Sequence, residues 1–414
     1  MAATQVCVVG GGPAGMVLGT LLARGGVRVT VLEKHTDFLR DFRGDTVHAS
    51  TLTLLDELGL GEELARLPQR RVETAEVVLD SGPVRVGDLR RLPGRHRHIA
   101  LVPQWDFLEL LASAAAREPT FSLRRDAEVV GVRRDGGGRV CGVVVRDRTD
   151  GATSEVGADL VVACDGRGST VRAAAGLPTR TFGVPMDVEW FRLPRADSDP
   201  SGLVGRISSG RMVVMIDRGG YWQCGFLVRH GGDEELRRQP VDHLRAELER
   251  LLPWLRGRTA DLAGWDDVSL LAVRLDRLRR WHAPGLLVIG DAAHAMSPVG
   301  GVGINLAIQD ATAAARHLGE VLRAGDPAPE ALDAACRRVQ RRRWLPTVLV
   351  QAGQRLAHRR IIRRVLGGDA PGASATRPPR ALQVLQRLPW LQGVPARLVA
   401  IGPLPEHAPP WARR

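Results

Sequence analysis

The chain opens on two short apolar runs that flank a segment in which apolar residues recur at helical spacing. Gln5 to Val9 and Val27 to Leu32 are the runs, and Ala14 to Arg24 carry the helical pattern. This order predicts a strand, a helix and a second strand, the βαβ unit of a Rossmann-type sheet. Two further helical patterns follow over Asp45 to Gly59 and Phe107 to Arg117.

Alternating apolar and polar residues dominate the middle of the chain. Ala127 to Val132 and Val140 to Arg146 alternate around a glycine-rich turn, which predicts a hairpin that leads into a buried strand at Asp159 to Cys164. Residues near 72 to 92 are strand-like, and 180 to 230 are rich in alternating strands. The second stretch predicts an antiparallel sheet outside the Rossmann-type unit.

The last third of the chain is predicted to be mainly helical. A helix near 241 to 252 precedes a buried strand at Leu286 to Ile289, and a glycine-rich loop then opens a helix over 303 to 323. The remainder, from about 328, carries helical patterns with a break rich in Pro, Gly and Ser at Gly367 to Pro379.

Composition places the chain among globular proteins. Its 414 residues are 44% hydrophobic and 25% charged, which suffices for two or three domains and excludes intrinsic disorder. Lys and Arg outnumber Asp and Glu by 58 to 46, a surplus of +12, and Lys34 is the one lysine. The arginines are spread along the chain and aromatic residues make up 4%, which leaves few platforms on which bases could stack. We therefore expect no nucleic-acid partner.

The cysteines and the apolar runs indicate in which cellular compartment the protein is located. Five cysteines without a C-x-x-C pair argue against a complete disulfide framework; they are Cys7, Cys141, Cys164, Cys224 and Cys336. The first residues lack a basic segment and a cleavage site, and no uninterrupted run of about 18 apolar residues occurs. These features predict a cytoplasmic protein that is neither exported nor membrane-spanning.

The first glycine-bearing motif lies between the first strand and the first helix. Gly10, Gly12 and Gly15 have G-x-G-x-x-G spacing, in which the glycines allow a tight turn, close approach of a pyrophosphate and close helix packing. Glu33 ends the second strand, where a carboxylate accepts hydrogen bonds from a ribose diol. The alternative is a glycine-rich turn beside a solvated Glu33. The motif alone does not separate FAD from NAD.

A second motif, Asp165 to Arg172, follows the buried strand and precedes a helix. A carboxylate at the carboxyl end of such a strand lies where ligands bind in open α/β sheets. Taken alone, this segment is better explained by an ordinary turn in which Ser169 or Thr170 caps the helix.

The third motif is Gly290-Asp291-Ala292-Ala293-His294, followed by the loop Pro298 to Asn305. Asp291 stands just past a buried strand, where it can bind a polyol hydroxyl. The loop presents backbone N–H groups at a helix N-terminus, which suits an anionic ring edge or a developing oxyanion. A histidine beside such a loop more often packs or forms a hydrogen bond than it acts as an acid or base, and we expect this of His294.

Together and in this order, the three motifs resemble the group A flavoprotein monooxygenases, the para-hydroxybenzoate hydroxylase-like family, over approximately residues 4 to 325. Two weaker matches support the resemblance. Arg43, in Phe42-Arg43-Gly44-Asp45, is similar to the family's arginine near the flavin, and Gln104 to its glutamine at the ribityl chain. Each has an alternative: Arg43 as a surface arginine paired with a neighbouring aspartate, and Gln104 as a helix N-terminal residue.

The resemblance implies an FAD site, NAD(P)H as a transient reductant and O2 as a co-substrate. It assigns Asp165 a dual role near FAD and NAD(P)H, and it places Arg43 and Pro298 near the flavin without assigning a catalytic residue. The implied cofactor-binding residues are Gly10, Gly12, Pro13, Ala14, Gly15, Glu33, Lys34, Arg43, Gln104, Val129, Asp165, Gly290, Asp291, Pro298, Gly301, Gly303, Ile304 and Asn305.

The resemblance also implies the architecture, an α/β fold with a GR2-type Rossmann FAD-binding domain, an antiparallel-sheet substrate domain and a helical C-terminal segment. We expect residues 1–70, 100–178 and 268–325 in the FAD-binding domain. Residues 71–99 and 179–267 would form the substrate-binding sheet, and 326–414 the helical C-terminal region. There is no second Rossmann fingerprint, which fits transient docking of NAD(P)H.

The reaction expected is monooxygenation of an aromatic or polyketide-like small molecule through a flavin C4a-hydroperoxide. The flavin carries such chemistry, so no nucleophile, triad or metal cluster is required, and none is found in the sequence. Epoxidation, Baeyer–Villiger insertion and halogenation are chemically adjacent. A flavin oxidase or dehydrogenase of the same fold is the first alternative, and a non-catalytic flavin sensor the second.

Substrate contacts are expected from the antiparallel sheet, although burial in the core is the expected fate of any single one of them. The candidates are Met212, Met215, Tyr221, Trp222, Gln223, Cys224 and Phe226, and alternation sends them to two faces. In the C-terminal stretch Arg337 to Arg364, we expect a solvated basic helix face packed on the FAD domain. Peripheral contact with a membrane is the less favoured alternative.

Overall fold

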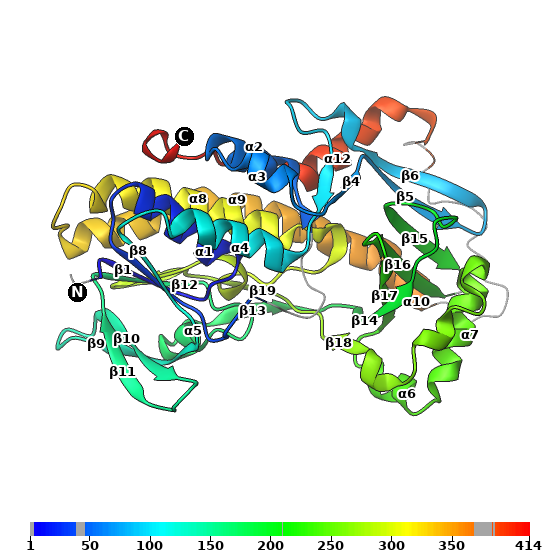
Figure 1. The fold of residues 1–414 in the computed structure, drawn as a ribbon, viewed down its shortest axis with the longest axis horizontal. Coiled ribbons are helices and arrows are strands. Elements are labelled where there is room, and N and C mark those ends of the chain that lie inside the picture. Colours follow the sequence, from blue (N-terminus) through cyan, green and yellow to red (C-terminus); the bar gives the residue numbers. More distant parts are fainter. Residues whose placement is uncertain (1–3, 39–45, 209, 368–382, 384–385) are drawn as a thin grey trace.

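The computed structural model describes residues 4–38, 46–208, 210–367, 383 and 386–414 (Figure 1). At its centre is a six-stranded sheet whose strands are parallel except for one edge strand. In spatial order the strands are β20 (His282–Ala283), β21 (Leu286–Val288), β12 (Leu160–Ala163), β1 (Val6–Val9), β2 (Val29–Leu32) and β8 (Phe121–Arg124). The central strands carry almost no polar side chains because both faces of the sheet are covered.

Helices cover one face of this sheet and a second sheet covers the other (Figure 1). On the first face lie α1 (Pro13–Arg24), α4 (Gln104–Ala115) and α8 (Gly303–Leu322), and α9 (Pro329–Ala357) packs on α8. On the other face lie α5 (Thr170–Ala174) and the antiparallel strands β9 (Ala127–Arg134), β10 (Val140–Asp147) and β11 (Thr153–Gly157). Alternation along β1 sends Val6 and Val8 to the helical side and Cys7 and Val9 to the other.

A seven-stranded sheet forms the other end of the molecule (Figure 1). Its order is β18 (Ser269–Leu271), β14 (Met186–Pro194), β17 (Tyr221–Arg229), β16 (Arg211–Asp217), β15 (Leu203–Ser208), β5 (Thr74–Leu79) and β6 (Gly82–Asp88). All neighbours are antiparallel except β15 and β5. The helices α6 (Asp233–Arg237) and α7 (Val241–Leu251) lie at this end of the molecule, and α7 packs on one face of the sheet.

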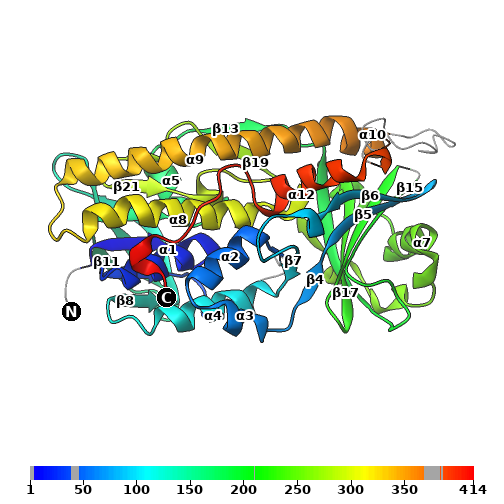
Figure 2. The same cartoon turned by 90° about the horizontal axis from the view of Figure 1, so that it is seen from above.

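The two sheets are joined by a strand pair and by the long helix. The pair is β13 (Thr179–Phe182) with β19 (Leu275–Leu278), which run antiparallel. Figure 2 shows α9 extending along the molecule toward the seven-stranded sheet, where a π-helical turn at His358–Ile362 leads into α10 (Arg363–Leu366). In the described part of the chain, no helix combines the length and apolar character that crossing a membrane requires.

Smaller elements complete the fold. The strands β3 (Thr46–Val47), β7 (Ile99–Leu101) and β4 (Arg70–Val72) form a small sheet beside α2 (Ala49–Glu57) and α3 (Gly61–Ala65). Near the C-terminus, α12 (Gly393–Ala400) packs against β6, and Trp411 lies so close to Gly25 and Gly319 that neither could carry a Cβ without displacing the ring.

The α/β class, the Rossmann-type sheet, the antiparallel sheet and the C-terminal helices were all predicted from the sequence, and the structure confirms them. One local prediction was wrong. The helical pattern from Asp45 to Gly59 begins as a strand, because the β-branched pair Thr46 and Val47 joins β7, and the helix starts only at Ala49. The break predicted at Gly367 to Pro379 lies almost wholly outside the described residues.

Candidate functional site

The three motifs lie at one edge of the central sheet. Gly10 follows β1, Asp165 follows β12 and Gly290 with Asp291 follows β21, while Glu33 follows β2. Because β21, β12, β1 and β2 are neighbouring parallel strands, their carboxyl ends share this edge. The fold therefore gathers segments that are separated by up to 280 residues in sequence into one row.

The glycines of the first motif differ in what surrounds them. Gly10 has a φ of +103°, and a Cβ there would lie 2.8 Å from the carbonyl carbon of Cys164. A Cβ at Gly15 would collide with the carbonyl oxygen of Gly10. At Gly12, by contrast, no atom lies within 4 Å of where a Cβ would stand. Gly10 and Gly15 thus allow tight packing, whereas Gly12 leaves open space at the N-terminus of α1.

Glu33 is buried against the first motif. The Gly11 amide donates to its Oε2 at 2.9 Å, and the His35 amide donates to its Oε1 at 3.1 Å. Lys34 beside it is exposed, while Val129 on β9 is buried in the core between the central sheet and the β9–β11 sheet. The carboxylate is thereby held at the turn, next to the α1 N-terminus.

Asp165 has one oxygen satisfied and one not. Its Oδ2 accepts a hydrogen bond from the Val171 amide at 3.1 Å, whereas its buried Oδ1 has no partner among the described residues. Burial raises the pKa of this carboxyl above its ordinary value. Ser169 caps α5 by accepting from the Arg172 amide at 3.0 Å, as one reading of the sequence expected.

Arg172 connects the second motif to the third. Its guanidinium donates to the carbonyl oxygens of Ala292 at 3.0 Å and of Arg167 at 2.8 Å. Asp291 is partly exposed, with one carboxylate oxygen 3.9 Å from Nε of Arg167. A Cβ at Gly290, whose φ is +61°, would stand 3.4 Å from that of Ala14. The third motif is therefore packed directly against α1 and the first motif.

The loop that opens α8 presents backbone rather than charge. Gly300 and Gly301 have φ values of +81° and +61°, which lets the loop turn sharply between Pro298 and α8. Gly303 faces Asp291, because a Cβ there would lie 3.9 Å from its Oδ1. Neither α8 nor α1 has a capping side chain or an acidic residue in its first turn. Two helix N-termini therefore keep free amides at this site.

Two residues assigned to this loop bind protein groups. Asn305 is buried, and its Oδ1 accepts from the hydroxyls of Ser50 at 2.7 Å and Thr51 at 3.0 Å, so its side chain joins α8 to α2. Ile304 is partly buried and packs against the core beneath the helices.

Side chains at the end of α9 and in the following turn form hydrogen bonds with the same loop and with Ser297 just before it. Gln354 accepts from the Ser297 amide at 3.2 Å and donates to the carbonyls of Ser297 at 2.8 Å and Val299 at 2.9 Å. The ring of His358, at the π-helical turn, lies 2.8 Å from the Ser297 hydroxyl. Sequence reasoning missed both residues, because their partners lie about 60 residues away and no local pattern marks them.

Deeper still, charged side chains are buried together. Nε2 of His294 and Nε of Arg343 bind the two oxygens of Asp310 at 2.5 Å and 3.0 Å, and Asp310 also accepts from the Gly290 amide. Burial acts to raise the pKa of Asp310, but His294 and Arg343 hold it below its ordinary value. Arg343 also approaches Glu406 at 3.5 Å.

This cluster bears on two expectations. His294 is a hydrogen-bonding core residue, as expected. The expectation that Arg341 to Arg343 form part of a solvated basic face was wrong for Arg343, which is fully buried. Its charge can be buried because it forms ion pairs with Asp310 and Glu406.

A second histidine near the loop was also missed. His48 precedes α2 and is fully buried; its Nδ1 lies 2.8 Å from the Val399 carbonyl oxygen, and its Nε2 has no partner among the described residues. Burial lowers its pKa to about 4, so the ring is neutral at neutral pH.

The candidate substrate residues divide between the two faces of the seven-stranded sheet. Met215, Trp222, Cys224 and Phe226 are buried in the core between the sheet and α7, where they cannot touch a ligand on the opposite face. Met212, Tyr221 and Gln223 lie on that opposite face.

The opposite face packs against Ile362 and Leu366 of the C-terminal helical segment, which form one apolar cluster with Val188 and Leu227 of the sheet. Trp190, Met212 and Val214 of the sheet and Val299 of the loop that opens α8 pack against this same cluster. Trp190 is only partly buried as a residue, and its indole N–H has no partner among the described residues. It was not among the predicted substrate residues, although its position in an alternating strand was a signal for it.

The two weaker sequence matches have different outcomes. Gln104 is the first residue of α4, and Pro103 precedes it as the N-cap. Arg43 lies outside the described residues.

The residues at the sheet edge fit FAD. Gly12 leaves room for a pyrophosphate, the free amides of α1 and α8 suit anionic groups, and the buried Oδ1 of Asp165 lacks a donor that a ligand would supply. Glu33 and Asp291 offer carboxylates for hydroxyl groups. In the described residues, no cluster of His, Cys, Asp and Glu could hold a metal ion.

Comparisons with known proteins agree with this fit. Residues 3–346 match the family model described as an FAD binding domain. The chain is 35% identical over 392 residues to 6-methylpretetramide 4-monooxygenase of Streptomyces rimosus, covering 88% of this chain and 93% of that protein. It is 30% identical to 12-dehydrotetracycline 5-monooxygenase/anhydrotetracycline 6-monooxygenase of Streptomyces rimosus subsp. rimosus, covering 80% of this chain and 65% of that protein.

Solved structures show the same fold. PqsL of P. aeruginosa in complex with 2-aminobenzoylacetate superposes with a TM-score of 0.75 at 22% identity, covering 88% of this chain and 99% of that one. The OxyS anhydrotetracycline hydroxylase of Streptomyces rimosus has a TM-score of 0.71 at 25% identity, covering 96% of this chain and 75% of that one.

Proposed function

The chain belongs to the FAD-dependent monooxygenase family, and we propose that it consumes NAD(P)H and O2 to hydroxylate an aromatic, polyketide-like small molecule. The observation that carries the proposal is that Val299, in the loop that opens α8, packs against the same apolar cluster as one face of the seven-stranded sheet. This cluster provides an apolar surface beside the end of the FAD site. The relatives named for 6-methylpretetramide and anhydrotetracycline point to the same substrate class.

We assign the ADP half of FAD to the first motif. Gly10, Gly12 and Gly15, with Pro13 and Ala14, would receive the pyrophosphate at the α1 N-terminus, and Glu33 would accept from the ribose. Asp291 would bind the pyrophosphate or ribityl region. The remaining assignments, to Lys34, Arg43, Gln104, Val129, Asp165 and Gly290, and to Pro298, Gly301, Gly303, Ile304 and Asn305, stay predictions; the buried contacts of Val129 and Asn305 favour an indirect role for both.

Bound FAD supplies the redox chemistry, accepting a hydride from the nicotinamide and activating O2 for transfer of one oxygen atom. The chain's own contribution is to bind, orient and exclude water. Backbone amides between Pro298 and Gly303 would stabilise negative charge at the flavin's pyrimidine edge. Gln354 and His358 keep this loop in place through the hydrogen bonds to Ser297 and Val299.

The substrate would lie on the apolar face that carries Trp190, Met212 and Val214. A buried indole N–H without a partner is a donor available to a substrate oxygen, and the neighbouring side chains accept an aromatic ring. Of the residues predicted from the sequence, Met212, Tyr221 and Gln223 remain candidates on this face. We also propose a cytoplasmic location, which the five free cysteines support.

The experiment that tests the function follows NAD(P)H oxidation by the FAD-loaded protein over a panel of phenols, quinones and polyketide aromatics, with oxygen uptake and peroxide release measured together. Oxidation stimulated by a compound, with little peroxide, would support monooxygenation and identify the substrate class. Anaerobic reduction of the flavin by a panel compound alone, without NAD(P)H turnover, would instead place the protein among oxidases or dehydrogenases and refute the proposal.

The assignment of Asp291 is tested separately. Asp291→Ala removes a carboxylate that would accept charge-assisted hydrogen bonds, each contributing about 1.5–3 kcal/mol, so the Kd for FAD should rise at least about tenfold. Fluorescence titration of the apoprotein with FAD measures this. Asp266→Ala, at an exposed aspartate in the other domain, is the matched control. Equal affinities in the two variants would refute the assignment.

A further inference from the structure

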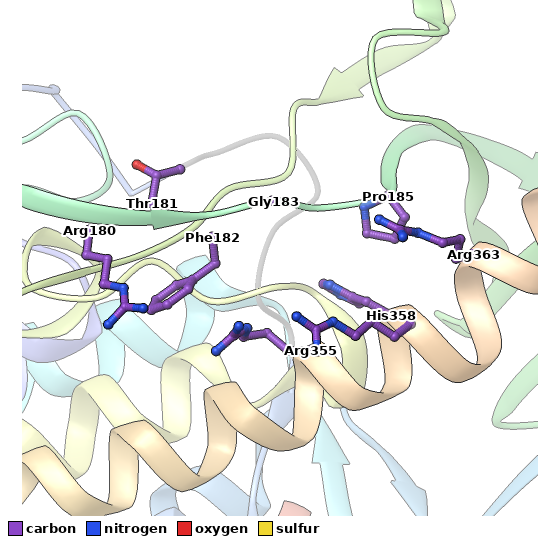
Figure 3. Close-up of a pocket in the computed structure, with 9 residues that line it drawn as sticks. Arg180, Thr181, Phe182, Gly183, Pro185, Arg355, His358 and Arg363 are labelled. Carbon is purple, nitrogen blue, oxygen red and sulfur yellow. The ribbon is translucent and has the colours of Figure 1, made fainter.

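A cavity of about 340 Å³ lies between the strand β13 with its following loop and the last turns of the long helix (Figure 3). Four arginines line it: Arg180 from the strand, Arg355 from α9, Arg359 from the π-helical turn and Arg363 from α10. Figure 3 shows the side chains of Arg355 and His358 extending from the helix toward the strand and loop. We call this cavity the arginine pocket.

The positive charge of the arginine pocket has no negative partner among the described residues. Among the described residues, no carboxylate lines the pocket, and none of its four arginines forms an ion pair with a carboxylate. Elsewhere in the chain such pairs are common, as between Arg343 and Asp310. The part of the chain that the structure describes therefore gathers like charges here without a counter-charge.

A fifth arginine adds to the crowding. The guanidinium groups of Arg180, Arg277 and Arg355 lie 5.3, 5.5 and 4.7 Å from the ring centre of Phe182. Burial and the positive charges of Arg180 and Arg355 lower the pKa of Arg277. Such repulsion destabilises the folded chain unless an anion neutralises it.

The pocket suits the phosphate groups of a larger molecule more than a single small anion. Residues 355, 359 and 363 recur at the spacing that places side chains on one helix face, opposite Arg180. Guanidinium groups bind phosphate oxygens with paired hydrogen bonds. The volume is about ten times the roughly 30 Å³ that one water occupies, so it admits a molecule that extends beyond one ion.

The pocket is also connected to the loop that opens α8. His358 forms part of its wall, and the same ring lies 2.8 Å from the hydroxyl of Ser297, the residue before Pro298. The other ring nitrogen of His358 is buried and has no partner among the described residues. A ligand in the pocket would thus share a wall residue with the loop assigned to the flavin.

We propose that the arginine pocket binds the phosphate groups of the reducing pyridine nucleotide. This inference rests on the proposed function, because it takes NAD(P)H as the reductant. It gives the nucleotide's phosphates a place in a chain whose sequence contains one Rossmann fingerprint rather than two.

A binding experiment tests the pocket without turnover. The FAD-loaded protein is titrated calorimetrically with 2′-phospho-ADP-ribose, with ADP-ribose and with inorganic phosphate. Arg355→Ala and Arg359→Ala should each raise the Kd of the nucleotide fragments about tenfold, whereas Arg360→Ala, on the same turn but outside the pocket, should leave it unchanged. The ratio of the two fragments' affinities reports whether the 2′-phosphate is bound.

Two results would overturn the proposal. One is fragment binding that both pocket variants leave intact. The other is inorganic phosphate that binds as tightly as the fragments, which would show a simple anion site.

Kinetics separates a failure of the pocket from a failure of the proposed function. If the wild type oxidises NAD(P)H, Arg355→Ala should raise the KM for the nucleotide and leave kcat at saturation unchanged, because a phosphate contact binds ground and transition states alike. An unchanged KM would refute the pocket and leave the function standing. A wild-type flavin that NAD(P)H does not reduce would refute both.

Discussion

Two groups of arginines on one continuous helical segment differ in how their charge is balanced. Arg343, near the middle of α9, is fully buried and binds Asp310, with Glu406 at 3.5 Å. Arg355, three turns further along, and Arg359 just beyond it face the arginine pocket, where no carboxylate of the described residues pairs with them. The first group is internally neutralised and the second is open to an external anion.

The difference follows from what solvent can reach. A buried charge without a partner costs several kcal/mol, and at Arg343 the chain supplies two carboxylates, whereas the buried Arg277 binds the side-chain oxygen of Gln351 instead. An arginine at the edge of an open pocket stays hydrated, and its charge remains available to a ligand. Sequence composition does not distinguish the two groups, since both look like basic helical segments.

The largest effect is expected when the enclosed pair is broken. Arg343→Met removes the guanidinium and leaves Asp310 in the core with only His294 and the Gly290 amide as partners among the described residues, so the free energy of unfolding should fall by about 3–5 kcal/mol. Urea denaturation of the apoprotein measures the change. Arg341→Met, at an exposed arginine on the same helix, should change it by less than about 0.5 kcal/mol. Equal losses of stability in the two variants would mean that the buried Arg343 contributes no more to the free energy of unfolding than the exposed Arg341.

His48 sharpens the comparison, because it is a buried base with no carboxylate bound to its ring among the described residues. It is neutral instead, with a pKa of about 4 against 6.5 for an ordinary histidine. Below pH 6.5 the His48 ring binds a proton in the unfolded chain but stays neutral in the folded chain. The free energy of unfolding therefore falls as the pH is lowered toward 4. Between pH 7 and pH 4.5 this group should remove about 2.5 kcal/mol from the free energy of unfolding.

Replacing His48 isolates that contribution. His48→Asn keeps a donor for the Val399 carbonyl but cannot titrate, so its stability should fall less between the two pH values than that of the wild type. Urea denaturation of both proteins at pH 7 and pH 4.5 gives the difference. Parallel losses in the two proteins would show that His48 does not take up a proton on unfolding in this range.

The contrast between arginines also shows which parts of the site a sequence reveals. The glycine motifs were predictable, because Gly10 and Asp165 each follow an apolar strand directly and the relation is local. The fold class followed from the same patterns. Their convergence was inferred from the family resemblance and is visible in the order of the parallel strands.

The supporting contacts were not predictable, because they depend on tertiary distance. Gln354 binds residues 55 to 57 positions away, and Arg343 and Asp310 are 33 apart. On the sheet, alternation showed that the candidate substrate residues occupy two faces, but not that α7 covers the face with Trp222 and Phe226. Arg180 lies more than 170 residues before the other pocket arginines, so no local pattern could unite it with Arg355.

The smallest effect on stability is expected at the arginine pocket. Arg355→Gln removes one of the charges that repel Arg277, while giving up a contact with the Phe182 ring whose contribution at an exposed site is about 0.5–1 kcal/mol. These effects oppose each other, so the free energy of unfolding should change by less than about 0.5 kcal/mol.

Salt separates the two contributions at Arg355. Repulsion between the guanidinium groups is strongest in dilute buffer, because screening extends over about 30 Å at 0.01 M salt and about 3 Å at 1 M. The variant should therefore gain stability relative to the wild type as salt is lowered, in urea denaturation at the two concentrations. A loss above 1 kcal/mol that salt does not alter would make Arg355 a structural residue like Arg343, and the distinction between the two groups would fail.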